Sequence, residues 1–469
     1  MKLKGVMTID LIDAVTGEVD TVVEENMITN SVNNILGINP AGMYLTAGEN
    51  YDSITNWNDV LLPICPNMIG GILLFSATLA EDVNHIYEGS ANLPVAYASN
   101  DVNATADTKR GSMNLTESKV LDNGYRFVWE FTPSQGNGTI AAVALTSAQG
   151  GKAGYGSTED VASPFLQMRE GRLNHQSDEQ LEDLALMVYL NFEEGYFINA
   201  RYQSSSVILK KNRMPVFDIG LNERLNDMTC TLLDEQTLHC TTFKFPGSYT
   251  PYGNFFDGGD GYIYGFANQS NSSGNATLYW IKIKLEDYSF TEGVWTLSNV
   301  QMQETGSYKF ASYPDRFIKS VVRNGYLYTM SYDKTAVYKI NVNNQADVTK
   351  IQLGFTSAFS SLGGSGSSEN HMVLVGDLII AWDFQITAND EVIPTLGAAR
   401  FKSIETALFA YKNYLTCISG SYGSSYHHWY ILTPYLASIN NLDTAVVKTT
   451  DKTMKITYEL TEVEPEEET

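Results

Sequence analysis

A short pattern recurs between residues 189 and 437, and it limits the possible folds more than any other feature of the sequence. Each copy has a turn glycine or asparagine, a short apolar strand, a polar loop and a second strand. The clearest copies start at Gly195, Gly261 and Gly325, and weaker ones start at Gly376 and Asn413. Repeated hairpins of this kind predict a β-propeller, in which each antiparallel sheet packs face to face on the next.

The spacing of the copies is irregular, so the pattern does not fix the number of blades. Two of the intervals are long enough to contain a further blade, for example around residues 238–245. We therefore predict about five to seven blades. An ordinary β-sandwich built from similar hairpins is the alternative fold.

Alternating apolar and polar residues predict strands on both sides of this region. Residues 2–24 are predicted to form a β-hairpin, and residues 69–75, 125–131 and 139–145 are predicted to form further strands. Helices are predicted at residues 30–36, where Thr29 or Asn30 can cap the start, and at about residues 177–188. Residues 453–460 also alternate and are predicted to pair with the N-terminal hairpin.

These patterns divide the chain into three parts and predict a mostly β protein. Residues 1–188 are predicted to form a β-rich attachment domain and residues 189–437 a propeller. Residues 438–469 are predicted to return as a strand to the N-terminal domain and to end in an acidic tail. The 28 tyrosines and 20 phenylalanines agree with this prediction, because aromatic residues favour strands.

The charge balance argues against several classes of partner. The chain has 30 basic and 54 acidic residues, which gives a net charge of −24. Nucleic-acid binders need a basic footprint and anionic membranes attract basic segments, so neither partner is expected. No apolar run approaches the roughly 20 residues of a spanning helix, so no membrane insertion is expected. No signal peptide is recognisable, and we expect synthesis in the cytoplasm.

Few residues suggest chemistry, and we predict no catalytic residue, no metal site and no cofactor. Asp257 and Asp260 lie in a glycine-rich segment that could hold calcium but is better explained as a turn that connects blades. Residues 364–368 form a glycine–serine segment without the pattern of a nucleophile elbow. His427 and His428 are adjacent, and neighbouring side chains of a strand point to opposite faces, so they would not chelate a metal together.

Two further groups of residues are assigned to packing. Four cysteines have no paired spacing and are expected to be buried free thiols: Cys65, Cys230, Cys240 and Cys417. The aromatic-rich segment 422–430 could stack on sugar rings, but packing between blades is the simpler explanation. The sequence therefore assigns no ligand-binding residue.

Three segments resemble virion structural proteins of tailed bacteriophages and of prophages of Gram-positive gut bacteria. The first covers residues 1–37 and opens with Met-Lys-Leu-Lys-Gly. The second covers residues 126–140 and includes Arg-Phe-Val-Trp-Glu-Phe-Thr-Pro-Ser. The third covers residues 440–458 and includes Val-Lys-Thr-Thr-Asp-Lys-Thr-Met-Lys. The middle of the chain resembles the variable, propeller-like inserts of these proteins only in its general sequence pattern. The motifs in the three segments are structural rather than catalytic.

The resemblance implies a non-enzymatic structural component of a phage virion, made in the cytoplasm of the host bacterium. We expect a tail fibre, spike or tail-tip protein whose propeller contacts a host-surface glycan or protein, or another virion protein. A homo-oligomer is expected, because virion appendages sit on symmetry axes. The alternatives are a head- or collar-attached fibre, a virion-borne glycan hydrolase or lyase, and a cellular adhesin, which the missing signal peptide disfavours.

Overall fold

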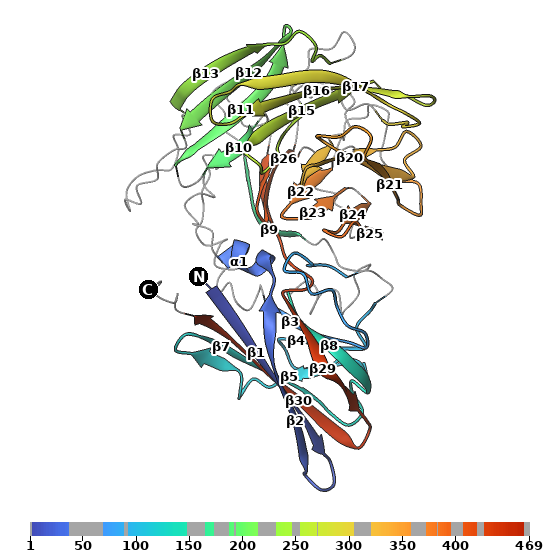
Figure 1. Cartoon of the computed structure of the whole chain (residues 1–469). Coiled ribbons are helices and arrows are strands. Elements are labelled where there is room, and N and C mark those ends of the chain that lie inside the picture. Colours follow the sequence, from blue (N-terminus) through green and yellow to red (C-terminus); the bar gives the residue numbers. More distant parts are fainter. Residues whose placement is uncertain are drawn as a thin grey trace, which may run out of the picture.

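The computed structural model describes fourteen stretches of the chain, and nearly all of them are β structure (Figure 1). They are residues 2–36, 69–88, 92–147, 165–172, 187–191, 194–213, 231–245, 254–269, 271–303, 320–357, 372–381, 383–394, 407–419 and 426–463. One ten-stranded sheet, here called the base, lies at one end of the molecule. Five four-stranded sheets lie at the other end, and α1 (Asn30–Leu36) lies between the two parts.

The base collects strands from both ends of the chain. Their order in the sheet is β4-β3-β8-β29-β2-β1-β30-β7-β5, with β6 beside β7. The strands are β1 (Lys2–Asp13), β2 (Val19–Ile28), β3 (Gly71–Phe75), β4 (Ala96–Ser99), β5 (Ser112–Met113), β6 (Lys119–Leu121), β7 (Gly124–Phe131), β8 (Gly138–Thr146), β29 (Ser438–Lys448) and β30 (Lys452–Val463). The predicted N-terminal hairpin and the strands predicted in residues 69–145 are therefore confirmed.

The predicted return of the C-terminal strand is also confirmed. β30 runs antiparallel to β1 from the pair Lys2–Val463 to the pair Asp13–Lys452. Its other edge pairs with β7 from Met454–Phe131 to Thr461–Gly124. Because β30 is paired on both sides, it is an internal strand of the base. The alternating pattern occurs at both ends of the chain because β1 and β30 are neighbours in one sheet.

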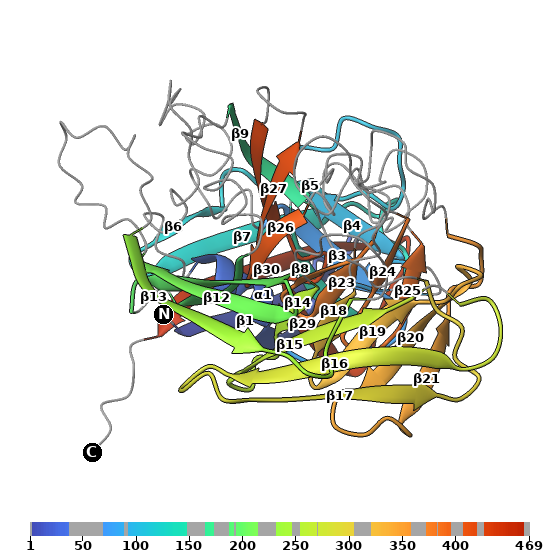
Figure 2. The ribbon, with the colours of Figure 1, turned by 90° about the horizontal axis from the view of Figure 1, so that it is seen from above.

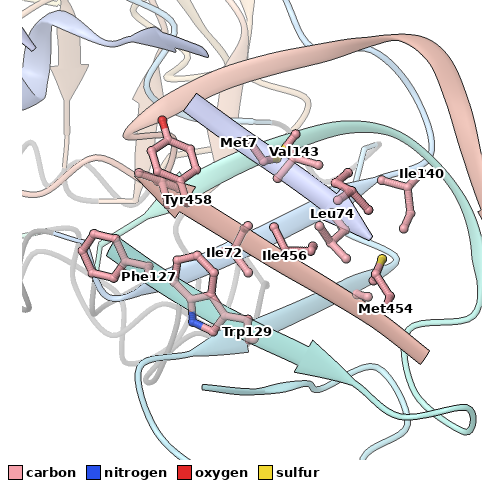
Figure 3. Packing of buried hydrophobic residues seen from close by; sticks show 14 of the residues in the cluster. Met7, Ile72, Leu74, Phe127, Trp129, Ile140, Val143, Met454, Ile456 and Tyr458 are labelled. Atoms are coloured by element: carbon pink, nitrogen blue, oxygen red, sulfur yellow. The ribbon is translucent and has the colours of Figure 1, made fainter. Parts of the chain in front are cut away.

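The core of the base is built from side chains that converge on the inside of this curved sheet (Figure 3). Met7 and Ile456 come from paired central strands, and Trp129 and Ile72 come from strands on either side of them. All four side chains are fully buried. In β1 and β30, buried residues such as Met7 and Ile456 alternate with less buried neighbours, which explains the period of two that the sequence shows at both ends of the chain.

The five remaining sheets are the blades of a β-propeller, and each is numbered in order of its first strand. Blade 1 contains β10 (Met187–Asn191), β11 (Tyr196–Gln203), β12 (Ser206–Arg213) and β13 (Thr231–His239). Blade 2 contains β14 (Phe255–Asp257), β15 (Tyr262–Asn268), β16 (Ala276–Lys284) and β17 (Phe290–Leu297). Blade 3 contains β18 (Val321–Arg323), β19 (Tyr326–Met330), β20 (Ala336–Asn341) and β21 (Val348–Gln352). Blade 4 contains β22 (Val373–Val375), β23 (Leu378–Ile380), β24 (Phe384–Ile386) and β25 (Val392–Pro394). Blade 5 contains β26 (Ala407–Tyr411), β27 (Tyr414–Ser419), β28 (Tyr426–Leu432) and β9 (Phe165–Arg172).

The first strands of the blades form a closed ring. β10 neighbours β14, β14 neighbours β18, β18 neighbours β22, β22 neighbours β26, and β26 returns to β10. Strands β13, β17 and β21 lie at the rim (Figure 2). The described chain thus contains five blades, and each repeated sequence copy supplies the second and third strands of one of them. A further blade around residues 238–245 is wrong, because β13 is the fourth strand of blade 1.

The predicted boundary between residues 188 and 189 is wrong, because β9 belongs to the propeller. β9 pairs with β28 from Phe165–Leu432 to Arg172–Tyr426 and completes blade 5. A strand from before the repeats therefore closes the ring, and a repeat pattern cannot reveal a strand that lies outside it. The helix predicted at 177–188 fails at Val188, which lies in β10, and the rest of it lies outside the described residues.

The base and the propeller share a hydrophobic core. Leu73 and Phe75 of β3 belong to one buried cluster with Val373 and Leu378 of blade 4. The Nδ2 of Asn413 in blade 5 also donates a hydrogen bond to the Oγ of Ser31 in α1, at 2.5 Å. The described part of α1 begins as predicted, but the hydroxyl of Thr29 donates to the carbonyl oxygens of residues 436 and 437 rather than capping the helix.

Candidate ligand site in the propeller channel

The first strands of the blades enclose a cavity of about 430 Å³. Its wall is lined by residues of all five blades: Met187, Val188, Leu190, Phe255, Phe256, Val321, Val322, Met372, Val373, Leu374 and Ala410. This volume lies within the range of small-molecule pockets, which are commonly about 300–1,000 Å³. Many of these apolar side chains also belong to the buried clusters between neighbouring blades, as Phe255 and Phe256 do on opposite faces of β14.

In blades 2 to 5, charged residues gather where the first strand turns into the second. Asp257 of blade 2, Arg323 of blade 3, Asp377 of blade 4 and Lys412 of blade 5 all line the cavity. The backbone N–H of Gly376 donates to the carbonyl oxygen of Lys412 at 2.7 Å, which ties the turns of blades 4 and 5 together. The cavity therefore combines apolar residues of the first strands with charged residues of both signs at its mouth.

Both acidic residues of the mouth hold their protons more strongly than usual. Loss of hydration raises the pKa of Asp257, and the neighbouring carboxylate of Asp260 raises it further. Loss of hydration also raises the pKa of Asp377, while Arg323 opposes the shift and Asp82 of the base adds to it.

The glycine-rich segment that holds Asp257 and Asp260 is a turn inside blade 2, so its prediction as a turn that connects blades is wrong. Oδ1 of Asp257 accepts the N–H of Gly259 at 2.9 Å, and Oδ2 of Asp260 accepts the hydroxyl of Tyr264 at 2.7 Å. Gly259 has a φ of 69°, which glycine adopts more readily than other residues. The two carboxylates thus stabilise the turn, and no group of three metal ligands occurs in the described residues.

Arg323 is held by its own structural contacts. Its guanidinium donates to the carboxylate of Asp390 in blade 4 at 2.8 Å and to the carbonyl oxygen of Asp377 at 2.7 Å. The same Asp390 accepts the hydroxyl of Tyr328 at 2.9 Å and the ammonium of Lys339 at 2.6 Å. The network links blade 3 to blade 4.

The repeated tyrosines of the sequence serve a packing role near this end of the blades. A lysine of the third strand lies over the ring of the first tyrosine of the second strand in three successive blades. The ammonium-to-centroid distances are 3.8 Å for Lys211 and Tyr196, 4.1 Å for Lys282 and Tyr262, and 4.5 Å for Lys339 and Tyr326. Cation–π contacts of this kind are worth about 0.5–2 kcal/mol each. They account for part of the repeat without any ligand.

The other residues singled out in the sequence lie away from this cavity or outside the described chain. Cys240 is a half-buried free thiol, and burial raises its pKa to about 11, so it is a poor nucleophile. His427 and His428 lie in β28 and pair with Gly171 and Glu170 of β9. Residues 65, 230, 364–368 and 422 lie outside the described residues.

The sequence did not predict the cavity, because it is formed by the weakest part of each repeat. The first strands of blades 2, 3 and 4 have only three residues each. Short apolar segments of this length carry no periodic signal. A carboxylate or a cation immediately after such a segment, repeated from blade to blade, is the one signal that could have indicated the mouth.

Comparisons with known proteins add little to this geometry. No family model matches the chain, and no curated protein matches it. Among solved structures, AztD of Citrobacter koseri is 12% identical with a TM-score of 0.21, over 64% of this chain and 62% of AztD. The matched region thus spans about three fifths of AztD, and a likeness this distant carries no argument about function. Within the described residues, no helix has the length and apolarity needed to cross a membrane.

Proposed function

We propose that this chain is a non-enzymatic structural component of a bacteriophage virion, of the fibre, spike or tail-tip kind. In this proposal the base attaches the protein to the particle. The propeller binds a host-surface glycan or protein, or a neighbouring virion protein. A head- or collar-attached fibre is the alternative placement within the same class.

The observation that carries the proposal is the convergence of the three segments that resemble phage virion proteins. Residues 1–37 contribute β1 and β2, residues 126–140 contribute β7 and the start of β8, and residues 440–458 contribute β29 and much of β30. These strands are neighbours in the order β8-β29-β2-β1-β30-β7. Segments separated by hundreds of residues thus form one structural unit, which supports a resemblance of the whole base rather than of scattered motifs.

The connection between the base and the propeller is also consistent with a base that holds the propeller out for binding. The propeller is inserted between strands of the base, and blade 4 shares a buried cluster with β3 and β8. A shared core restricts the relative motion of the two parts. Binding by many identical rigid copies gives avidity without high affinity at each site.

The first experiment localises the protein in the particle. Antibodies raised against the purified chain should label intact phage particles at one fixed position when examined by electron microscopy. The purified chain should also bind host cells and reduce phage adsorption in a dose-dependent manner. Particles that contain no copy of the chain would refute the proposal. Labelled particles with no effect on adsorption would indicate that the propeller binds another virion protein.

A virion-borne glycan hydrolase is the second candidate, and one observation favours it. Asp257 and Asp377 line the same cavity, and glycoside hydrolysis uses two carboxyl groups. An acid–base pair requires environments that push the two pKa values apart, whereas here both pKa values are raised. Release of reducing ends from host envelope glycan that is abolished by Asp377→Asn, and not by Asp122→Asn, would favour the hydrolase. Binding without product release supports the non-enzymatic proposal.

A further inference from the structure

The base contains an open edge at the end farthest from the propeller (Figure 1). β2 pairs with β1 over eight residues, from Val19–Ile12 to Asn26–Gly5. On its other side β2 pairs with β29 only at Met27 and Ile28. Within the described residues, the outer backbone edge of residues 19–26 therefore has no partner strand.

The facing edge of β29 is protected, whereas the edge of β2 is not. The register of β29 on β8 shifts between Asn441 and Val446, and the exposed residues 443–445 of the strand have no partner in β8. Bulges of this kind prevent edge pairing. The pairing of β2 with β1 has no register shift, and residues 19–26 contain no proline or lysine. The edge of β2 is thus regular enough to accept another strand.

The two faces of this edge differ in chemistry. Residues opposite each other in a sheet share a face, and the buried residues Leu11 and Met7 lie opposite Asp20 and Glu24. An acidic side chain therefore lies on each side of Val22 on the face that continues the core. The opposite face carries Val19, Thr21, Val23 and Glu25, and the two valines are 52% and 59% exposed.

The local charge determines which strand this edge can accept. Lys452 pairs with Asp20 at 3.1 Å, and Lys4 pairs with Glu25. In the described residues, Glu18 and Glu24 have no ion pair, so the edge is net acidic. A second copy of β2 would bring like charges together, which is destabilising across a pair of strands.

We propose that β2 binds an extended segment of another protein by strand addition along residues 19–26. The segment alternates basic residues, which face Asp20 and Glu24, with β-branched residues, which face Val19, Thr21 and Val23. Strand addition obtains affinity from main-chain hydrogen bonds and specificity from the alternating side chains. The idea that this segment belongs to a neighbouring virion protein rests on the proposed function, whereas the binding chemistry of the edge does not.

The binding chemistry is tested on the full-length purified chain with two ten-residue peptides. One alternates lysine and valine, and the other alternates glutamate and valine. Hydrogen exchange measured by mass spectrometry should slow in residues 19–26 when the lysine peptide is added, and not when the glutamate peptide is added. Protection confined to other strands, or equal protection by both peptides, would overturn the proposal.

Two variants separate strand addition from general attraction to an acidic protein. Glu24→Lys should weaken binding of the lysine peptide by about tenfold, a change of about 1.4 kcal/mol. Asp122→Lys makes the same change of charge in the exposed turn between β6 and β7, and it should alter binding by less than about twofold. If Glu24→Lys fails to fold, Val19→Lys at a solvent-exposed position replaces it with the same expected weakening. Equal effects of the edge and control variants would refute the proposal.

A photo-crosslinking residue at position 23 then identifies the protein that contacts β2 in the phage particle. Crosslinks to a lysine- or arginine-containing segment of another virion protein support the proposed partner, with position 120 of β6 as the control. Crosslinks only to a second copy of this chain would overturn the argument from charge. Peptide protection in a protein that is absent from particles would refute the proposed function and leave the binding chemistry of the edge intact.

Discussion

Two groups of strands in the base bury their side chains in different ways. In β1 and β30, alternate residues such as Ile9 and Ile456 are fully buried, and their neighbours are partly exposed. In β3 all five residues are buried, because Ile72 and Leu74 face the core of the base while Leu73 and Phe75 face blade 4. The first group has one buried face and the second has two.

The difference explains why the two groups look different in the sequence. A strand buried on one face alternates apolar and polar residues, whereas a strand buried on both faces is a continuous apolar run. Residues 71–75 are therefore all apolar because one face of β3 packs against the propeller and the other packs in the core of the base. An apolar run predicts that a second layer exists, but it does not identify that layer.

The largest effect on stability is expected from removing β30, one of the strands that are buried on one face only. Deletion from Asp451 onward removes β30, which is paired on both sides and contributes Met454, Ile456 and Tyr458 to the core. The loss should exceed the roughly 5–15 kcal/mol that stabilises a typical domain, so the base should unfold. No described residue of blades 1–3 belongs to this core, and these blades should keep their hydrogen-exchange protection.

Hydrogen exchange measured strand by strand provides the check. Loss of protection in β1, β2 and β7 with retained protection in β11, β15 and β19 is the expected result. Protection that persists in β1 and β7 after the deletion would contradict the role of β30 as an internal strand. Uniform loss of protection would show that the propeller cannot fold without the base.

Leu73 and Leu74 allow the two faces of β3 to be compared directly. Both side chains are fully buried, and they are adjacent in the chain but belong to different clusters. Each leucine-to-alanine substitution should cost about 2–5 kcal/mol in the free energy of unfolding. Leu73→Ala should also increase hydrogen exchange in blade 4, whereas Leu74→Ala should increase it in β1 and β30. Equal exchange in blade 4 for both variants would contradict the shared core.

Much of the fold was predictable because its elements carry local signals. The alternation at residues 453–460 marks one strand, and the turn glycines before Tyr196, Tyr262 and Tyr326 mark the starts of three others. The role of β9 was not predictable, because its partner β28 lies more than two hundred residues later in the chain. Ring closure is a property of the whole propeller, and no local pattern specifies it.

The candidate site was less predictable than the fold. The segment that holds Asp257 was recognised as a turn, but its contact with a cavity depends on four other blades. Asp377 and Lys412 follow short apolar segments and give no motif. The inter-blade lock formed by Arg323 and Asp390 also joins residues that are distant in the sequence, so composition alone could not pair them.

A smaller effect on stability is expected from the titration of Lys448. This residue lies in β29, which is placed between β8 and β2 in the base. Its ammonium is buried and donates to the carbonyl oxygen of Thr132 and to Oδ1 of Asn137, both at 2.9 Å. Burial lowers its pKa to about 8, and Asp451 opposes the shift. The unfolded chain therefore binds more protons than the folded chain between about pH 8 and the ordinary lysine value of about 10.4.

The stability of the protein should consequently rise with pH across this window. The buried charge is fully present, and its cost greatest, below about pH 8, and the cost disappears as the pH passes the unfolded pKa. The rise is at most about 3 kcal/mol, because one pKa unit corresponds to about 1.4 kcal/mol. Urea unfolding at several pH values should show this slope in the parent and not in Lys448→Met. The same slope in both proteins would assign it to other groups.

The smallest effect on stability is expected from substitutions on the outer face of the strands that are buried on one face only. Thr457 lies opposite Thr8 of β1, and its side chain points away from the core that Ile456 and Tyr458 enter. Thr457→Val keeps the shape and the strand preference of the side chain, so the free energy of unfolding should change by less than about 0.5 kcal/mol. Ile456→Ala, one residue earlier, should cost several times more, about 2–5 kcal/mol. If the two substitutions had similar costs in urea unfolding, the outer face would have to be covered as well, and the distinction between one buried face and two would not hold.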